Sequence, residues 1–315
     1  MQIITDVLRA HLLPGLSNVE AVPHLTFRGW LAKKSFKMTE PLESKAFKLD
    51  VYSHSELLLP YAYDINRMAA SSIESMNGIT PENGLPKSTG WLIIRSYYSA
   101  YFAMHALLRL FGISCSQLDS HESRAVTDVA RMYSLQNGNT ASSGYYRCQY
   151  DFTSSTIIFK QLNNTHQDVW KTFYELLDTL ATKVSSSDFR KKDRDITVDF
   201  LFKLREGLSC RNTVNSGNWL SQIRNEVNYT HSMGAWYPYV NSSDEHNKMF
   251  RLTSNWKQTP TADIINDNVG KCDQLLFVST CVTVVSLCHS MISDLHNINS
   301  NIFLKHGAIR LVNQI

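Results

Sequence analysis

The chain has 315 residues, of which 43% are hydrophobic and 19% charged, and a formal net charge of +3 at pH 7. This length fits one large domain, or one domain with an extension, and the apolar content is enough for a proper core. The mild charge permits nucleic-acid binding but does not argue for it, since a dedicated DNA-binding protein usually shows a dense basic stripe. The one strong basic cluster, residues 190–194, is expected to be a solvated loop between helices.

The six cysteines show no C-x-x-C spacing and no regular framework. They are typical of reduced, mostly buried thiols. The first residues lack a basic segment followed by a long apolar run, so no signal peptide is expected. The apolar stretch 275–292 contains several Ser and Thr and a His, which favours a buried core helix over a membrane span. We therefore predict a cytoplasmic protein without membrane association.

Residues 1–54 show the least regular pattern of the chain and are predicted to be an N-terminal extension of unclear structure. Within them, residues 25–31 and 46–52 alternate loosely between apolar and polar and are predicted to be short strands. Residues 55–315 are predicted to form a separate helical domain.

From residue 55 onward the apolar spacing is helical. Asn77-Gly78 and Gly112 suit helix ends, while Asp119 and Glu122 form a candidate capping box. Helices are predicted at residues 55–76, 91–111, 119–133, 168–184, 197–208, from 216 through the segment around 224, and at 271–297. Residues 135–164 and 232–269 are rich in Asn and Ser and are predicted to be long inserted loops, the first of them with some strand. The expected fold class is therefore all-α: a helical bundle with an irregular N-terminal extension that contains short strands.

The segment 224–231 (RNEVNYTH) carries the main candidate site. At about 100° per residue, the seven steps from Arg224 to His231 return to nearly the same helix face, about 10 Å along the axis. Both lie on the flank of the apolar stripe of Leu220, Ile223 and Val227, where a charged group usually has a partner. A fixed cation beside a group that titrates near neutral pH suits phosphodiester chemistry. The spacing alone is near chance expectation, and an arginine–carboxylate bridge between two helices would give the same pattern.

A second cluster lies on the predicted helix 91–111. Tyr98, Phe102 and His105 share one face of it. An aromatic core helix with a hydrogen-bonded histidine accounts for this pattern. The functional alternative is that Arg95 or His105 reaches the helix that carries Arg224.

Two motifs in this order resemble the HEPN superfamily. The first is Ser96-Tyr97-Tyr98-x-x-Tyr101 with Ala106-Leu107-Leu108, then Gly112 and His121. The second is Arg224-Asn225-x5-His231, which is similar to the HEPN ribonuclease motif of an Arg, a polar residue and a later His. The resemblance covers residues 55–300, with insertions at 135–164 and 232–269. The gap of about 110 residues between the motifs exceeds that of a minimal HEPN domain and leaves the middle helices unassigned.

The resemblance implies an α-helical homodimer whose two motif helices form one composite ribonuclease site. His231 would transfer protons, Arg224 would stabilise the phosphate, and Asn225 would orient the pair. Asn228, Arg95 and His105 are the candidate substrate-binding residues. The RNA 2′-OH would be the nucleophile, so no metal and no cofactor is expected. Many relatives are toxins or antiviral defence effectors, which makes an antitoxin or another defence-system component a further candidate partner.

The alternative is a non-catalytic helical interaction module that binds a protein or nucleotide partner, in which Arg224 and His231 serve structure alone. Other chemistries are disfavoured, because the sequence has no H-E-x-x-H zinc motif, no Gly-rich phosphate loop and no G-x-S-x-G elbow.

Overall fold

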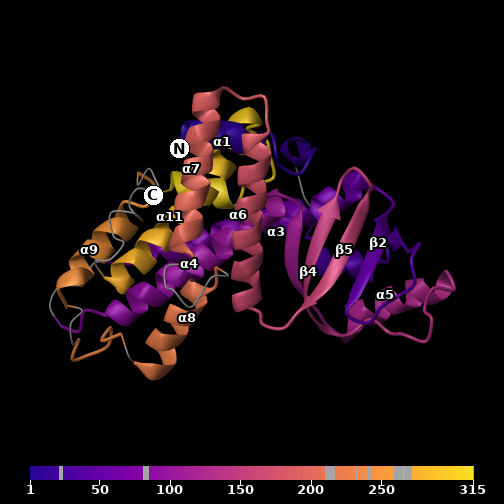
Figure 1. Ribbon diagram of the computed structural model, residues 1–315, viewed down its shortest axis with the longest axis horizontal. Helices are drawn as coiled ribbons and strands as arrows, with labels where there is room; N and C mark the ends of the chain where they lie inside the picture. Colours follow the sequence, from indigo (N-terminus) through magenta and orange to yellow (C-terminus); the bar gives the residue numbers. More distant parts are fainter. Residues whose placement is uncertain are drawn as a thin grey trace.

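The fold is a mixed α/β arrangement in which a five-stranded sheet lies at one end of the molecule and a helical bundle at the other (Figure 1). The computed structural model describes residues 1–20, 24–80, 85–209, 217–231, 233–239, 243–258, 265 and 272–314. The expectation of an all-α fold is wrong, because residues within 36–51 and 113–162 supply five strands that pair in one sheet, where only short strands in the extension and some strand in the loop 135–164 were expected.

The sheet is antiparallel throughout and has the strand order β1-β2-β5-β4-β3. Its strands are β1 (Phe36–Lys37), β2 (Ala46–Val51), β3 (Ile113–Leu118), β4 (Gly144–Asp151) and β5 (Thr156–Leu162). In β4, Tyr146, Cys148 and Tyr150 are buried while the residues between them are more exposed. This alternation with a period of two is what a sheet with one covered face requires.

The β4–β5 hairpin accounts for most of the segment predicted to be the loop 135–164. Its turn is held by Asp151, whose Oδ1 accepts from the Thr153 backbone N at 2.9 Å and whose Oδ2 accepts from Ser154 Oγ at 2.7 Å. Such local bonds to an Asp carboxylate stabilise a turn as a backbone bond would. The polar residues of this segment therefore form the turn and the exposed face of a hairpin.

Residues 1–54 contribute to both parts of the molecule. They form α1 (Gln2–Arg9), the short 3-10 helix η1 (Leu16–Asn18), α2 (Phe27–Ala32), β1 and β2. The predicted strand 46–52 is confirmed by β2, but the predicted strand 25–31 is wrong. Thr26 caps α2 by accepting from the Gly29 backbone N, and Phe27 stacks on Phe159 of β5 with ring centroids 6.1 Å apart. The apolar residues of α2 therefore cover the sheet.

The helical bundle is built around α4 and α11, which pack against each other in the middle of the molecule (Figure 1). Its remaining members surround them. The bundle helices are α1, α3 (His54–Asn77), α4 (Thr89–Leu110), α6 (Gln167–Ser185), α7 (Lys191–Gly207), α8 (Trp219–Asn225), α9 (Ser243–Ser254), α11 (Asp273–Ile298) and α12 (Ala308–Asn313). Helix α5 (Ser120–Met132) lies at the sheet end, where it contacts α2 and β3 (Figure 1).

Helix α11 is long and apolar enough to cross a membrane, the one such helix among the residues described. Within its most apolar 18-residue window, 89% of the residues are buried inside the protein. Ser279, Thr280 and Thr283 bond back to carbonyls one turn earlier on the helix. The helix is thus already covered on all sides by the bundle, as a core helix is.

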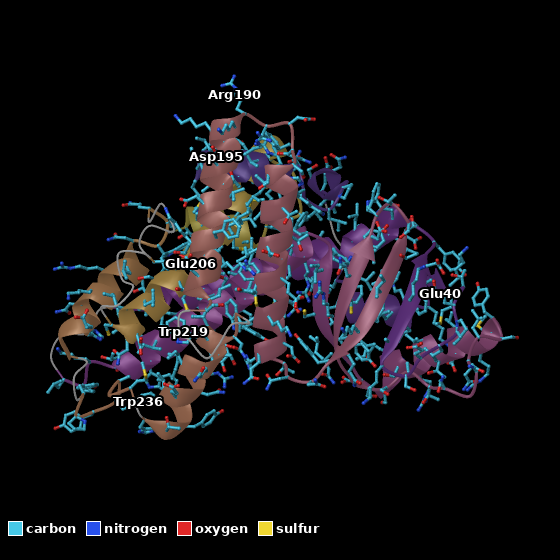
Figure 2. All side chains as sticks on the ribbon, in the orientation of Figure 1. Glu40, Arg190, Asp195, Glu206, Trp219 and Trp236 are labelled. Atoms are coloured by element: carbon cyan, nitrogen blue, oxygen red, sulfur yellow. The ribbon has the colours of Figure 1, made fainter. Side chains whose placement is uncertain are left out.

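Several predicted helix ends are confirmed, one helix begins earlier than predicted, and one helix occupies a predicted loop. The capping box of Asp119 and Glu122 opens α5 as expected. Helix α7 begins at Lys191, so most of the basic cluster 190–194 is its first turn rather than a loop, with exposed Arg190 projecting from its end (Figure 2). Helix α9 occupies part of the predicted loop 232–269. Ser216, the predicted start of the motif helix, lies outside the described residues.

Candidate functional site

The motif segment 224–231 is not one regular α-helix. Helix α8 ends at Asn225 and continues as a π-helical turn, η2 (Glu226–Thr230), after which His231 adopts a left-handed backbone with φ 54°. A π turn contains more residues than an α turn, so the ideal wheel that placed Arg224 and His231 on one face does not hold here. Such turns are rare and occur frequently at functional sites.

Arg224 is 8% exposed and points toward α4 and the start of α6. Its Nη2 donates to His166 Nε2 at 2.8 Å and to Tyr98 Oη at 3.3 Å, and its Nη1 donates to Asn225 Oδ1 at 2.7 Å. The guanidinium also lies 5.6 Å from the centroid of the Tyr97 ring. None of these partners carries a negative charge.

No carboxylate pairs with Arg224 among the residues that the structure describes. In the same described part of the chain, its buried Nε–H has no hydrogen-bond acceptor. A buried cation without a counter-ion is costly, so such a group favours an anion in contact with it. The arginine–carboxylate bridge that would have explained the sequence pattern is therefore not what holds Arg224.

His166, which precedes α6, is the histidine bound to Arg224. Because a guanidinium only donates, His166 Nε2 must accept, and the ring proton lies on Nδ1. That atom lies 2.9 Å from Tyr97 Oη, which also accepts from Trp170 Nε1 at 3.1 Å. Burial, and then the charge of Arg224, lower the pKa of His166 to about 4. His166 is therefore neutral at pH 7 and leaves the positive charge of Arg224 uncompensated.

His231 lies apart from this hydrogen-bonded group. It is exposed, and its ring packs beside Trp236 with centroids 5.9 Å apart. Trp236 in turn donates from Nε1 to the Val227 carbonyl at 2.7 Å and lies against Gly90 of α4. An added Cβ at residue 90 would lie 2.6 Å from the indole, so only glycine permits this contact. Trp236 (Figure 2) thus fixes the end of η2 and the position of His231.

The two candidate amides differ in what they contact. Asn225 is half-buried and its side chain holds Nη1 of Arg224. Asn228 is half-buried on the π turn. The structure therefore joins Asn225 to Arg224 directly, while Asn228 lies one turn further along the same segment.

Arg95 and His105 both lie on α4 but line different cavities. Arg95 lines a groove of about 500 Å³ that also includes Tyr98. His105 is 3% exposed, and its Nδ1 lies 3.2 Å from Arg109 Nη1. It lines a separate cavity of about 810 Å³ between α2, α3, α4, β3 and α5. Burial and the Arg109 charge hold the pKa of His105 well below its usual value.

Sequence reasoning missed His166, Tyr97 and Trp170 as members of the site. Tyr97 was noted only as part of a family motif, and Trp170 only as part of an amphipathic helix. His166 follows Asn164, whose side chain accepts from two backbone N–H groups at the start of α6. Nothing in the sequence pairs it with a residue 58 positions later, so only the packing of α6 on α4 and α8 reveals this contact.

A scan against protein-family models finds no match, and searches of curated proteins and of solved structures find no significant one. The HEPN resemblance therefore stays a prediction based on the two motifs. Within the described ranges, no three His, Cys, Asp or Glu side chains gather as the ligands of a metal ion would.

Proposed function

We propose that this protein is a metal-independent endoribonuclease that acts as a homodimer, with Arg224 and His231 of two copies forming a composite site. The observation that carries the proposal is the state of Arg224: a buried, oriented guanidinium with neutral partners and no carboxylate among the described residues. A phosphodiester supplies the anion that such a group lacks.

In the proposed reaction, the RNA 2′-oxygen attacks the adjacent phosphorus and the bond from phosphorus to the 5′-oxygen breaks. The products are a 2′,3′-cyclic phosphate and a free 5′-OH. His231 removes the 2′-OH proton or protonates the leaving 5′-oxygen, and Arg224 stabilises the charge that develops on the phosphate. His166 and Asn225 position the guanidinium through their hydrogen bonds.

The separation of His231 from Arg224 within one chain supports a dimeric site rather than a monomeric one. His231 contacts Trp236 and is exposed, so the histidine that faces a given Arg224 could come from a second copy. Such a homodimer would be cytoplasmic and would act as a toxin or defence effector, with an antitoxin or defence-system component as a further partner.

The test compares the purified full-length protein with Arg224→Ala and His231→Ala on a single-stranded RNA. We expect each substitution to reduce cleavage about 100-fold or more, since both act on the transition state. Arg131→Ala and His306→Ala, at exposed positions, serve as matched controls and should cleave at the wild-type rate.

Two further readouts identify the chemistry. EDTA should leave the rate unchanged, and a 2′-deoxy substitution at the scissile nucleotide should abolish cleavage of that bond. Cleavage that persists in both variants, or that EDTA stops, would contradict the proposal.

A second candidate is a non-catalytic interaction module. It is favoured by the three protein hydrogen bonds that Arg224 already makes, which would also suit a purely structural role. Tyr229 and Tyr237, 74% and 71% exposed near the motif, would then contact a protein partner. Wild-type protein that leaves RNA intact, yet forms a stable complex that Tyr229→Ala disrupts, would favour this candidate.

A further inference from the structure

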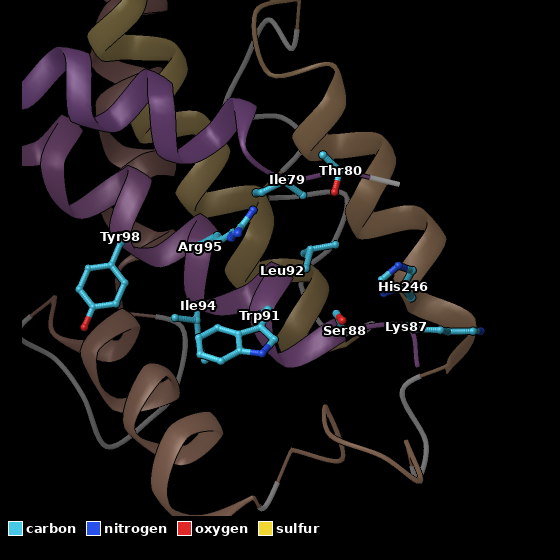
Figure 3. A pocket seen from close by; sticks show the side chains of 10 residues that line it. All are labelled: Ile79, Thr80, Lys87, Ser88, Trp91, Leu92, Ile94, Arg95, Tyr98 and His246. Atoms are coloured by element: carbon cyan, nitrogen blue, oxygen red, sulfur yellow. The ribbon is translucent and has the colours of Figure 1, made fainter. Parts of the chain in front are cut away.

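A groove runs along the N-terminal half of α4, between that helix, residues 79–80 and 87–88, and His246 of α9 (Figure 3). It encloses about 500 Å³. The residues that line it are Ile79, Thr80, Lys87, Ser88, Trp91, Leu92, Ile94, Arg95, Tyr98 and His246. We propose that this groove binds an unpaired nucleotide of the RNA strand next to the scissile phosphate, with its base on Trp91 and its phosphate at Lys87 and Arg95. This inference rests on the proposed function, because it names the form of RNA that the same site accepts.

The charge of the groove suits a phosphate. Lys87 and Arg95 carry positive charges, and none of the lining residues that the structure describes is a carboxylate. Arg95 donates from Nη1 to the Gly78 carbonyl, which holds its side chain along the wall beside Ile79 and Thr80 (Figure 3). A held cation loses less freedom on binding than a mobile one. A polyanion would therefore be attracted to this groove rather than repelled by it.

Trp91 offers a surface for a base. The side chain is 56% exposed, which is unusual for a tryptophan in a well-packed bundle. Trp236 packs against it edge-on, with ring centroids 5.6 Å apart and an interplanar angle of 90°. This contact fixes the ring while leaving a large part of it uncovered. Aromatic platforms beside basic side chains are the usual means by which proteins bind single-stranded nucleic acid without reading its sequence.

The groove leads directly to the candidate active site. Tyr98 lines the groove and its hydroxyl accepts from Arg224 Nη2 at 3.3 Å. Trp91 and Tyr98 are seven residues apart on α4, which is about 10 Å along the helix axis. A strand with one base on Trp91 therefore continues toward Arg224. Bases in a duplex are stacked on one another and cannot stack on Trp91, so the groove selects unpaired RNA.

The experiment measures RNA binding by the full-length His231→Ala protein, which should hold substrate without cutting it. The probe is a fluorescently labelled single-stranded RNA, followed by anisotropy, and the same sequence as a duplex. Adding Trp91→Ala should weaken the single-strand affinity about tenfold, as loss of one stacked base does, and Trp91→Phe should restore most of it. Lys87→Ala and Arg95→Gln should each weaken binding and reduce the slope of log affinity against log salt by about 0.7.

Matched controls are Phe202→Ala, which removes an exposed aromatic ring from α7, and Lys171→Ala, which removes an exposed lysine from α6. Both should bind as the parent does. Thermal unfolding of every variant checks that the fold is retained.

Three results would overturn the proposal: equal affinity of Trp91→Ala and Phe202→Ala, duplex binding as tight as single-strand binding, or a change of oligomeric state in Trp91→Ala with RNA affinity unchanged. The last would assign the groove to an interface between copies.

Failure of the ribonuclease proposal would give a different set of results. Wild-type protein would then bind single-stranded RNA through Trp91 without cutting it, whereas cleavage with an unchanged KM in Trp91→Ala would refute the groove alone.

Discussion

Two buried arginines contact α4, and each lies beside a neutral histidine, yet their environments differ. Arg109 is 3% exposed, lies next to His105, and has Asp64 Oδ2 at 3.8 Å from its Nε. Arg224 is 8% exposed, donates to His166, and has no carboxylate partner among the described residues. A buried arginine with a counter-ion stabilises the contact between two elements of the fold. A buried arginine without a counter-ion favours the binding of an external anion.

The largest expected difference between the two arginines is in stability. Arg109→Met should cost about 3 kcal/mol of unfolding free energy, because it leaves Asp64 buried with only Arg67 as a charged partner. Arg224→Met should cost about 1 kcal/mol, since only neutral acceptors lose a bond. Urea unfolding of both variants measures this. Adding Asp64→Asn should recover part of the Arg109→Met loss, and equal losses in the two single variants would break the comparison.

A substitution at Gly90 should disturb the contact of Trp236 with α4 and leave the surroundings of Arg109 unchanged. Gly90→Ala should cost about 1–3 kcal/mol, because the new Cβ meets the Trp236 indole. It should displace residues 233–239 and with them His231, so cleavage should fall while the Arg109 region keeps its stability. Urea unfolding and RNA cleavage report the two effects. Gly29→Ala on α2, where the nearest atom is a flexible Leu25 methyl, is the control; an unchanged cleavage rate in Gly90→Ala would refute the link.

Anion binding should distinguish the arginines directly. Inorganic phosphate at ten times its Kd should stabilise the wild-type protein by about 1.4 kcal/mol. We expect Arg224→Met to abolish this increment, because Arg224 is a buried cation with no carboxylate partner among the described residues, and Arg131→Ala to retain it. Urea unfolding with and without phosphate at constant ionic strength provides the measurement. Full stabilisation in Arg224→Met would place the anion elsewhere.

Acidification should have the smallest effect. The pKa of His166 is lowered to about 4 in the folded protein, against about 6.5 in an unfolded chain. Its contribution to stability is therefore fully present above pH 6.5 and is lost as the pH falls from 6.5 toward 4. Allowing for solvent screening of the partly exposed ring, we expect the loss of unfolding free energy between pH 7 and 4 to be smaller in His166→Asn than in the wild type, by on the order of 1 kcal/mol. Identical pH profiles for the variant and wild type between pH 7 and 4 would contradict the assignment.

Much of the helical part was predictable from the sequence. The apolar spacing of α3, α4, α6 and α11 predicted these helices to within a few residues, because each buries one face or its whole circumference. The capping box of α5 was also predictable, since its two bonds join residues three apart. The β4–β5 hairpin was predictable in principle from the alternation of Tyr146, Cys148 and Tyr150, which the many polar residues around it concealed.

The candidate site was predictable only in part. Arg224, Asn225 and His231 come from one short segment whose composition suggested the chemistry. The π turn that separates His231 from Arg224 was not predicted from the residue pattern, and neither was the hydrogen bond from Trp236 to the Val227 carbonyl within that turn. The pairing of Arg224 with His166 likewise depends on three helices meeting.

The sequence by itself determined the long helices α3, α4, α6 and α11 and the capping box of α5, because propensity and apolar period act over a few neighbouring residues. Only the tertiary structure decided that residues 46–51, 113–118, 144–151 and 156–162 share one sheet. It also decided that Arg109 has a carboxylate beside it, whereas Arg224 has none among the described residues. Those outcomes depend on contacts between residues far apart in the chain, whose energies arise from burial and charge in the assembled fold rather than from any local pattern.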